Sequence, residues 1–212
     1  EGLDLSFKAI EECDFFAKEQ GIDKIIFKTG DVRELDYADN TLSYYLSFGV
    51  IEHFREGPKK AMDEAFRTLK PGGIAFFGTP NKYSLNNNRT FIGWIFIFMD
   101  YPKRWVKKIV ELLKLRKKKK TEWVENYWTL NELKTYIRNS GFLVVDAATV
   151  DLKRTFDVNW RPQRKVLNKI LGKIKPFLYP FLDKFEDTKL GRFGTSNIVF
   201  AVKPGKKMSC FF

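Results

Sequence analysis

The stretch "DNTLSYYLSFGVIEHFREGPKKAMDEAFRTLKPGGIAFFGTPN", from Asp39 to Asn81, holds a strand–helix–strand pattern from which the fold class can be predicted. The segments "LSYYLSFGV" and "IAFFGTP" are short and rich in apolar and aromatic residues, which is typical of strands that helices cover on both faces. Between them, "PKKAMDEAFRTL" predicts an amphipathic helix that begins at Pro58, with apolar positions at Ala61, Met62, Ala65, Phe66 and Leu69. We expect Gly72 and Gly73 to separate this helix from the second strand.

The same alternation continues on both sides of this stretch. Upstream, "SFKAIEECDFFAKEQG" predicts a helix with Ser6 as its N-cap and Gly21 as its stop, and Lys24 to Lys28 predicts a short buried strand. Downstream, "TLNELKTYIRNSGFLVVDAATV" predicts a helix and a strand, and "SNIVFAVKP" predicts a last strand. The sequence therefore predicts an α/β fold with a doubly wound, mostly parallel, Rossmann-like sheet, formed by one domain over residues 1–212.

Composition excludes several other classes of protein. The chain has 212 residues, of which 44% are hydrophobic, enough to bury a core and too many for a disordered chain. Its two cysteines, Cys13 and Cys210, cannot form a disulfide framework, and the single histidine leaves no cluster with metal-ligand spacing. No apolar run approaches the ~20 residues of a membrane-spanning helix. We therefore expect a cytoplasmic protein without a metal.

The net charge of +12 is concentrated in one segment. Lys103 to Lys120 holds ten Lys or Arg residues and one acid, Glu111, so the remainder of the chain carries only +3. This segment lies in an expected helical insertion at residues 82–126, and a second basic amphipathic insertion is expected at residues 157–190. Two such segments favour a lid that faces an anionic membrane surface, whereas a lid with solvated lysines is the simpler alternative. Nucleic acid is a weaker candidate partner, because no aromatic stacking motif accompanies the charge.

In doubly wound sheets, ligands bind at the carboxyl ends of the strands, so the residues that follow each predicted strand are candidates for a site. In order along the chain, these segments read "GLDLS", "GDVRELDYADNT", "SFGVIEHF" and then "LKPGG" before the next strand. At these positions the chain resembles the class I S-adenosylmethionine-dependent methyltransferases, in particular the small-molecule branch that includes the quinone-biosynthesis O-methyltransferases. The resemblance is continuous from Glu1 to about Asn81 and resumes weakly further along.

The resemblance implies S-adenosylmethionine as the cofactor and a position for each of its parts. Asp4, with Leu5 beside it, matches the acid that binds the ribose hydroxyls, and a carboxylate suits a diol because it accepts two hydrogen bonds. Asp31 and Val32 match the adenine site, and Ser47 and Phe48 match the residues that flank the methionine part. Without the resemblance, Asp4 is equally explained by the dipole of the following helix, and Asp31 by turn formation after Gly30.

The resemblance also predicts that part of the fold lies outside the given chain. In this family a first strand and a glycine-rich loop precede the position of "GLDLS", and that loop lets the backbone approach the cofactor closely. Here "GLDLS" stands at the first residues, and the chain begins with Glu rather than Met. We therefore expect this chain to be an N-terminally truncated piece of a longer protein, without the first strand and the glycine-rich loop.

Glu52 and His53 are the candidate catalytic residues, because they follow the strand beside the expected methyl position. Methyl transfer to a weakly acidic hydroxyl gains from a general base, and histidine is suited to that role. The alternative is that both side chains hold the loop and the start of the next helix. No second histidine is available for a metal site.

The sequence thus predicts a methyltransferase that acts on a hydroxyl or amine of a small, amphiphilic or lipid-linked acceptor, in the cytoplasm and peripherally at the membrane. The alternative from another class is a non-catalytic, membrane-associating remnant of the same fold. A dehydrogenase is a weaker alternative, because a doubly wound sheet with a ribose-binding acid also suits NAD.

Overall fold

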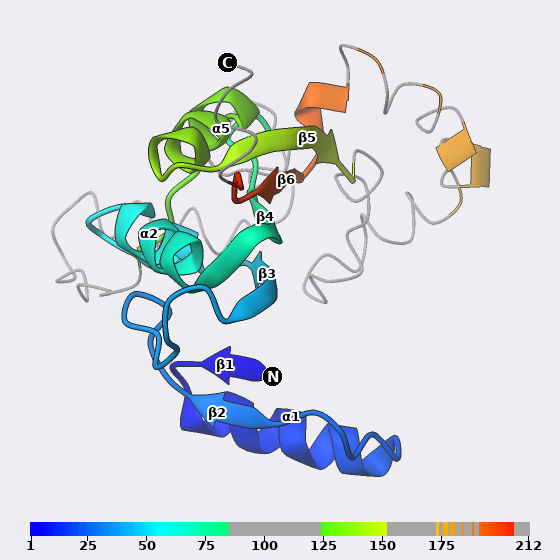
Figure 1. Cartoon of the computed structure of the whole chain (residues 1–212). Helices are drawn as coiled ribbons and strands as arrows, with labels where there is room; N and C mark the ends of the chain where they lie inside the picture. The colour runs from blue at the N-terminus through cyan, green and yellow to red at the C-terminus, as the bar shows by residue number, and fades with distance from the viewer. Residues whose placement is uncertain are drawn as a thin grey trace, which may run out of the picture.

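A computed structural model of the chain describes residues 1–84, 124–151 and 191–205, together with a few scattered positions between 173 and 188 (Figure 1). The described elements follow one another in the order β1 (Gly2–Asp4), α1 (Phe7–Glu19), β2 (Phe27–Thr29), β3 (Leu42–Phe48), η1 (Ile51–His53), α2 (Lys59–Thr68), β4 (Leu69–Pro80), α5 (Leu130–Asn139), β5 (Leu143–Val150), η3 (Gly191–Phe193) and β6 (Ser196–Val202). The strands form two separate sheets, one with two strands and one with four.

The larger sheet has the strand order β3-β4-β6-β5. β3 and β4 are parallel, and β6 runs antiparallel to both of its neighbours, so β5 points in the same direction as β4. This confirms the predicted α/β class, but the sheet is mixed, with one parallel and two antiparallel pairings. One face is covered by α2 and α5 (Figure 1), whose inward side chains are completely buried at Ala61, Met62, Ala65, Leu133 and Ile137.

The two covering helices have local signals that fix where they lie. α5 begins with a capping box, in which the Thr129 hydroxyl accepts from the Glu132 amide and the Glu132 carboxylate accepts from the Thr129 amide. α2 follows Pro58, as predicted, and its buried positions recur at helical spacing. Both helices therefore present one apolar stripe to the sheet and leave their polar faces exposed to solvent.

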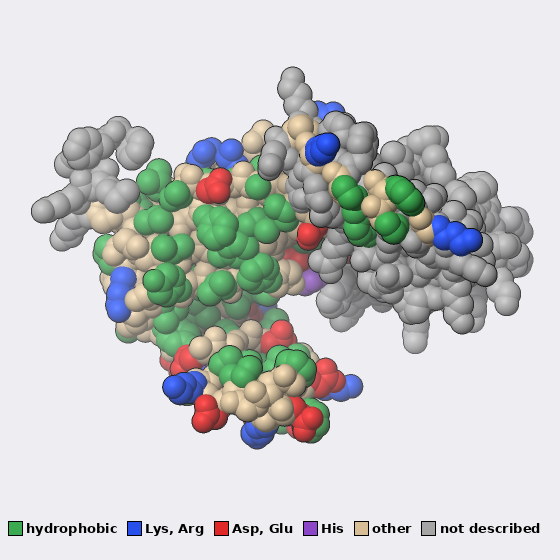
Figure 2. Space-filling model, turned by 90° about the vertical axis from the view of Figure 1, so that its right-hand side faces the viewer, with side chains coloured by type: hydrophobic (Ala, Val, Ile, Leu, Met, Phe, Trp, Pro, Cys, Tyr) green, Lys and Arg blue, Asp and Glu red, His purple; other side chains and the backbone are tan. Residues whose placement is uncertain are grey.

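The smaller sheet pairs β1 with β2 in parallel, and α1 connects the two strands. Ser6 caps α1 as predicted, because its side chain accepts a hydrogen bond from the Ala9 amide. Among the described residues, no strand pairs with the second edge of β1 or with the outer edge of β3. A strand outside this chain stays a prediction. Figure 2 shows the hollow that separates this lower part of the molecule from its main body.

The prediction that helices cover both faces of the strand "LSYYLSFGV", which is β3, is wrong for the described part of the chain. On β3, Tyr44, Leu46 and Phe48 are 68%, 67% and 60% exposed, while Tyr45 on the opposite face is buried. The reason is that α2 and α5 both lie on one side, and the other face of the sheet carries an open layer of hydrophobic side chains (Figure 2). Phe76 in this layer lies against Phe48 and Phe200, with ring centroids 4.5 and 4.7 Å away.

Two predicted strand positions also differ from the structure. The strand predicted from Lys24 to Lys28 lies instead at Phe27–Thr29. Ile25 and Ile26 are 43% and 57% exposed rather than buried, because among the described elements it is mainly β1 and α1 that contact this strand. The strand after α2 begins at Leu69 rather than at Ile74, because Leu69 pairs with Leu42 across the sheet. The two glycines therefore lie inside β4, where Gly72 adopts φ +82° and its amide donates to the Lys203 carbonyl.

The insertions predicted at residues 82–126 and 157–190, including the basic segment Lys103 to Lys120, lie almost entirely outside the described residues. Their predicted membrane contact and their role as a lid stay predictions. Where the chain is described, none of its helices has both the length and the apolar character needed to cross a membrane.

Candidate functional site

A cavity of about 590 Å³ lies between the facing edges of β1 and β3. Four of the six residues predicted to bind the cofactor line it, namely Asp4, Val32, Ser47 and Phe48. They come from the carboxyl ends of β1 and β3 and from the segment after β2, which is where parallel sheets bind ligands. The remaining wall follows the lengths of the two strands and is largely apolar, with Leu3, Tyr45 and Leu46 among its residues.

Asp4 holds one carboxylate oxygen in a local turn. Its Oδ1 accepts a hydrogen bond of 2.7 Å from the Ser6 amide, just before α1 begins. Within the described part of the chain, no hydrogen bond is seen for its Oδ2. Asp4 is exposed and lines the cavity, so its carboxylate can still accept a hydrogen bond from a ligand. Leu5, the neighbouring predicted residue, is 59% exposed and does not line the cavity.

Both carboxylate oxygens of Asp31 accept hydrogen bonds from Arg33. Asp31 Oδ1 accepts from the Arg33 amide at 2.8 Å, and Oδ2 accepts from the guanidinium at 2.7 Å. The hydrogen bonds from Arg33 hold the pKa of Asp31 below its usual range. This geometry agrees with the turn-forming alternative for Asp31, and the adjoining Val32 is the residue that lines the cavity.

The segment between β2 and β3 is bound to α2 through hydrogen bonds to the ion pair of Arg67 and Glu64. Arg67 donates to the Leu35 and Tyr37 carbonyls at 2.9 and 2.7 Å, and it pairs with Glu64 at 2.8 Å. Glu64 in turn accepts from the Leu35 amide at 2.9 Å. Because Leu35 and Tyr37 line the cavity, these contacts fix one of its walls relative to the larger sheet.

Glu52 and His53 lie in the short η1 turn that follows β3. The His53 Nδ1 lies 2.9 Å from the Val124 carbonyl. A carbonyl only accepts, so Nδ1 carries the hydrogen, and in a neutral imidazole the lone pair is then on Nε2. His53 lines neither of the two cavities described for this chain. Glu52 is only 2% exposed, and burial raises the pKa of its carboxyl group.

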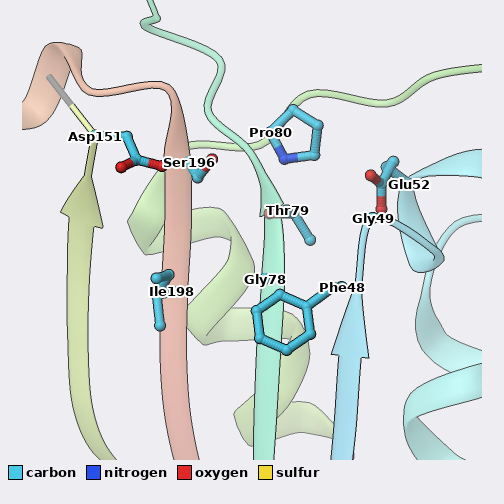
Figure 3. A pocket seen from close by; sticks show the side chains of 9 residues that line it. All are labelled: Phe48, Gly49, Glu52, Gly78, Thr79, Pro80, Asp151, Ser196 and Ile198. Carbon is cyan, nitrogen blue, oxygen red and sulfur yellow. The ribbon is translucent and has the colours of Figure 1, made fainter. Parts of the chain in front are cut away.

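A second cavity, of about 270 Å³, adjoins the first at the end of β3, because Phe48 lines both (Figure 3). Glu52 lies on one side of the end of β4 and Asp151 on the other, with Thr79 and Pro80 between them. The sequence pointed to Glu52 as a residue that follows a strand. Asp151 and Ser196 were missed, although Asp151 directly follows β5 (Leu143–Val150), a strand that the sequence did predict, and the same rule applies to it.

The described residues contain no group of His, Cys, Asp and Glu side chains that could hold a metal ion. They do fit an organic cofactor of the predicted kind. The cavity volume is in the range of about 300–1,000 Å³ that is usual for small-molecule sites. Ser47, at the carboxyl end of β3, is 4% exposed, and its Oγ has no hydrogen-bond partner in the described structure. An exposed carboxylate and an unpartnered hydroxyl in one cavity suit a ligand that carries both donors and acceptors.

Comparison with known proteins shows similarity to methyltransferases in sequence and in fold. Residues 1–77 match the family model described as "Methyltransferase domain". The chain is also similar to two curated proteins named ubiquinone/menaquinone biosynthesis C-methyltransferase UbiE. The one from Roseobacter denitrificans is 46% identical over 64 residues, which is 28% of this chain and 25% of that protein. The one from Ruegeria sp. is 41% identical over 85 residues, which is 37% and 33% of the two chains. The matched part thus spans about a quarter to a third of these relatives.

Solved structures agree with this fold across nearly the whole chain. The [4+2]-cyclase SpnF has a TM-score of 0.59 at 19% identity, with 96% of this chain and 65% of that chain covered. A methyltransferase of Methanosarcina mazei has a TM-score of 0.55 at 14% identity, with 96% and 81% covered. A putative sarcosine dimethylglycine methyltransferase from Galdieria sulphuraria has 0.52 at 15% identity, with 95% and 68% covered. At these identities the similarity establishes the fold, and together with the family model it supports S-adenosylmethionine as the cofactor.

Proposed function

We propose that this chain forms part of an S-adenosylmethionine-dependent methyltransferase that acts on a hydroxyl or amine group of a small acceptor. The observation that carries the proposal is the meeting of Asp4, Val32, Ser47 and Phe48 in one cavity. These residues are up to 44 positions apart in the sequence, and they lie at the carboxyl ends of β1 and β3 and in the segment after β2. The match of residues 1–77 to a methyltransferase domain supports the same conclusion.

In this proposal each of the four residues has a separate task. The Asp4 carboxylate accepts hydrogen bonds from the ribose hydroxyls, and Val32 lies beside the adenine. Ser47 and Phe48 flank the methionine part of the cofactor, whose positively charged sulfur supplies the methyl group. The Ser47 hydroxyl is buried and lacks a hydrogen-bond partner. A ligand that hydrogen-bonds to it would remove the free-energy cost of an unpartnered buried polar group. By fixing the cofactor at several points, these residues align its methyl group with the acceptor.

The proton of the acceptor has to leave when the new bond to the methyl group forms. His53 remains our proposed base although it lines neither cavity, because a neutral imidazole whose Nδ1 donates to the Val124 carbonyl has its lone pair on Nε2. Glu52 is the buried carboxyl group beside it and lines the second cavity directly. We propose this second cavity as the place of the acceptor, because it adjoins the cofactor cavity at Phe48.

The acceptor is proposed to be amphiphilic or lipid-linked, in line with the basic, amphipathic segments predicted outside the described residues. Carbon is a second candidate for the methylated atom, because both curated relatives are named C-methyltransferases. A fold of this kind does not by itself fix the reaction, since SpnF is named as a cyclase. The non-catalytic, membrane-associating remnant therefore remains the alternative that experiment has to separate from the enzyme.

Calorimetric titration with S-adenosylmethionine tests the proposal, using the full protein that carries this chain. Asp4→Ala should weaken binding by about 2–4 kcal/mol, because two charge-assisted hydrogen bonds are lost. Asp14→Ala, which removes an exposed acid of α1, is the matched control and should bind like the wild type.

Asp4→Asn separates a direct contact from an effect on the fold. This variant keeps an oxygen that can accept from the Ser6 amide, but it replaces the other oxygen with a donor. We expect Asp4→Asn to retain the stability of the wild type and still to lose affinity for the cofactor. Equal affinity in the wild type, Asp4→Ala and Asp4→Asn would remove Asp4 from the site, and a wild type that does not bind the cofactor would refute the proposed function.

A further inference from the structure

The second cavity contains buried polar atoms that the protein itself does not satisfy. Four buried side-chain atoms in the described structure lack a hydrogen-bond partner, and three of them belong to Ser47, Glu52 and Thr79. These three residues lie at or just after the carboxyl ends of β3 and β4, and each is at most 4% exposed. A buried polar group without a partner costs about 1–3 kcal/mol, so native proteins rarely keep one without a reason.

Glu52 and Thr79 both line this cavity (Figure 3). The unpartnered atoms are Oε2 of Glu52 and Oγ1 of Thr79. Asn126 fixes the backbone of Glu52, since its amide and its side-chain Nδ2 donate to the Glu52 carbonyl at 2.8 and 3.0 Å. Gly49 makes the turn before it with φ +66°, a conformation that other residues rarely adopt. The position of the carboxyl group is therefore set by the turn rather than by hydrogen bonds to its Oε2.

The lining of the cavity indicates the charge of its ligand. Two carboxyl groups, those of Glu52 and Asp151, line it, and its described lining includes no Lys or Arg. Apolar walls are formed by Phe48, Pro80 and Ile198. An anionic group would be repelled by the Glu52 carboxylate and would find no cationic partner among the described lining residues, whereas a donor group would satisfy Glu52 Oε2.

We propose that Glu52 and Thr79 form a subsite for a hydrogen-bond-donating head group, an ammonium or a hydroxyl, and that this subsite rejects carboxylates and phosphates. An ammonium donates to Glu52 Oε2 as a charge-assisted hydrogen bond. A hydroxyl donates to the same oxygen and accepts from the Thr79 hydroxyl, so both unpartnered atoms are satisfied at once. This inference deepens the proposed function and rests on it only for the statement that the head group belongs to a methyl acceptor.

Benzylamine, benzyl alcohol and benzoate are a matched series of probes, because they share one aromatic ring and differ in the charge of the head group. Their binding to the full protein can be measured by calorimetry or by NMR titration, without any catalytic activity. We expect benzylamine and benzyl alcohol to bind and benzoate to bind at least about tenfold more weakly. Equal affinity for the three probes, or tightest binding of benzoate, would overturn the proposal.

Variants assign the effect to the named residues. Glu52→Gln should weaken benzylamine binding by about 10- to 100-fold, because the charge-assisted hydrogen bond is lost, while benzoate binding stays the same or improves. Thr79→Val, which keeps the side-chain shape, should weaken benzyl alcohol more than benzylamine. Glu34→Gln is the control, since Glu34 is exposed and does not line the cavity. If Glu52→Gln binds benzylamine as the wild type does, with its unfolding midpoint unchanged, the subsite assignment fails.

The α-ammonium group of S-adenosylmethionine is a second source of the same chemistry. Adding the cofactor to the protein with bound benzylamine distinguishes the two sources. Simultaneous binding supports a subsite for the acceptor, and competitive displacement supports a subsite for the ammonium group of the cofactor. A protein that selects the probes by charge but does not bind S-adenosylmethionine would keep the subsite and refute the proposed function instead.

Discussion

Asn81 joins the end of β4 to the turn before β6, and its replacement should destabilise the protein strongly. The side chain is 1% exposed, and its Nδ2 donates to the carbonyls of Arg192 and Gly194, both at 2.8 Å. Its Oδ1 accepts from the Tyr83 amide at 3.2 Å. Three hydrogen bonds at about 0.5–1.5 kcal/mol each give an expected loss of about 2–4 kcal/mol for Asn81→Ala.

Asn81→Asp separates the loss of donors from the loss of volume. It keeps the shape of the side chain, but it places a carboxylate oxygen where Nδ2 now faces two carbonyl oxygens. Burial next to these acceptors would raise the pKa of the introduced carboxyl group in the folded state. The folded state would then bind the proton more tightly than the unfolded state, so the stability of this variant should fall as pH rises above the ordinary pKa of an aspartate.

Urea unfolding of the wild type and the two variants at several pH values measures these differences. At neutral pH, Asn81→Asp should be at least as unstable as Asn81→Ala, and it should recover part of its stability as the pH is lowered. Asn131→Ala, at an exposed position of α5, is the control and should change the free energy of unfolding by less than about 0.5 kcal/mol. A loss for Asn81→Ala no larger than that of the control would refute the reasoning.

Three further predictions concern His53 as the base, the dependence of stability on acid pH, and the basic segment Lys103 to Lys120. His53→Ala should lower turnover on a phenolic acceptor by about 10²–10⁴ with cofactor affinity nearly unchanged, and activity within about threefold of the wild type would exclude His53 as the base. Hydrogen bonds from Arg67 lower the pKa of Glu64 in the folded protein. The ionised Glu64 should therefore stabilise the fold above the ordinary pKa of a glutamate, and this stabilisation should disappear as pH falls through the lowered pKa. In urea unfolding, the stability of Glu64→Gln should accordingly depend less on acid pH than that of the wild type. Lys117 to Lys120 lie outside the described residues. Neutralising them should weaken binding to anionic vesicles, measured by sedimentation at low salt, by about 1 kcal/mol per charge. Binding that does not depend on salt would contradict a membrane-facing role.

Strands and helices with strong local signals could be predicted from the sequence alone. The capped helices α1 and α5, the amphipathic α2, and the strands β5 and β6 all lie where the pattern places them. The order of strand ends, with Asp4, Val32, Ser47 and Phe48 beside them, also followed from the sequence and the resemblance. Local hydrogen bonds and the period of the apolar residues determine these features, so little information from distant parts of the chain is needed.

Only the tertiary structure decided which faces and edges are covered and which polar groups find partners. The sequence of β3 looks buried on both faces, yet Tyr44 and Leu46 lie on an open face because both covering helices pack on the other side. The carboxylate of Asp31 accepts hydrogen bonds from Arg33, although from the sequence it was also a candidate to bind the cofactor. Glu52, rather than His53, lines the cavity next to the proposed cofactor site, and its Oε2 lacks a partner there. Burial and pairing depend on contacts between residues that are far apart in the chain, and a local pattern does not contain that information.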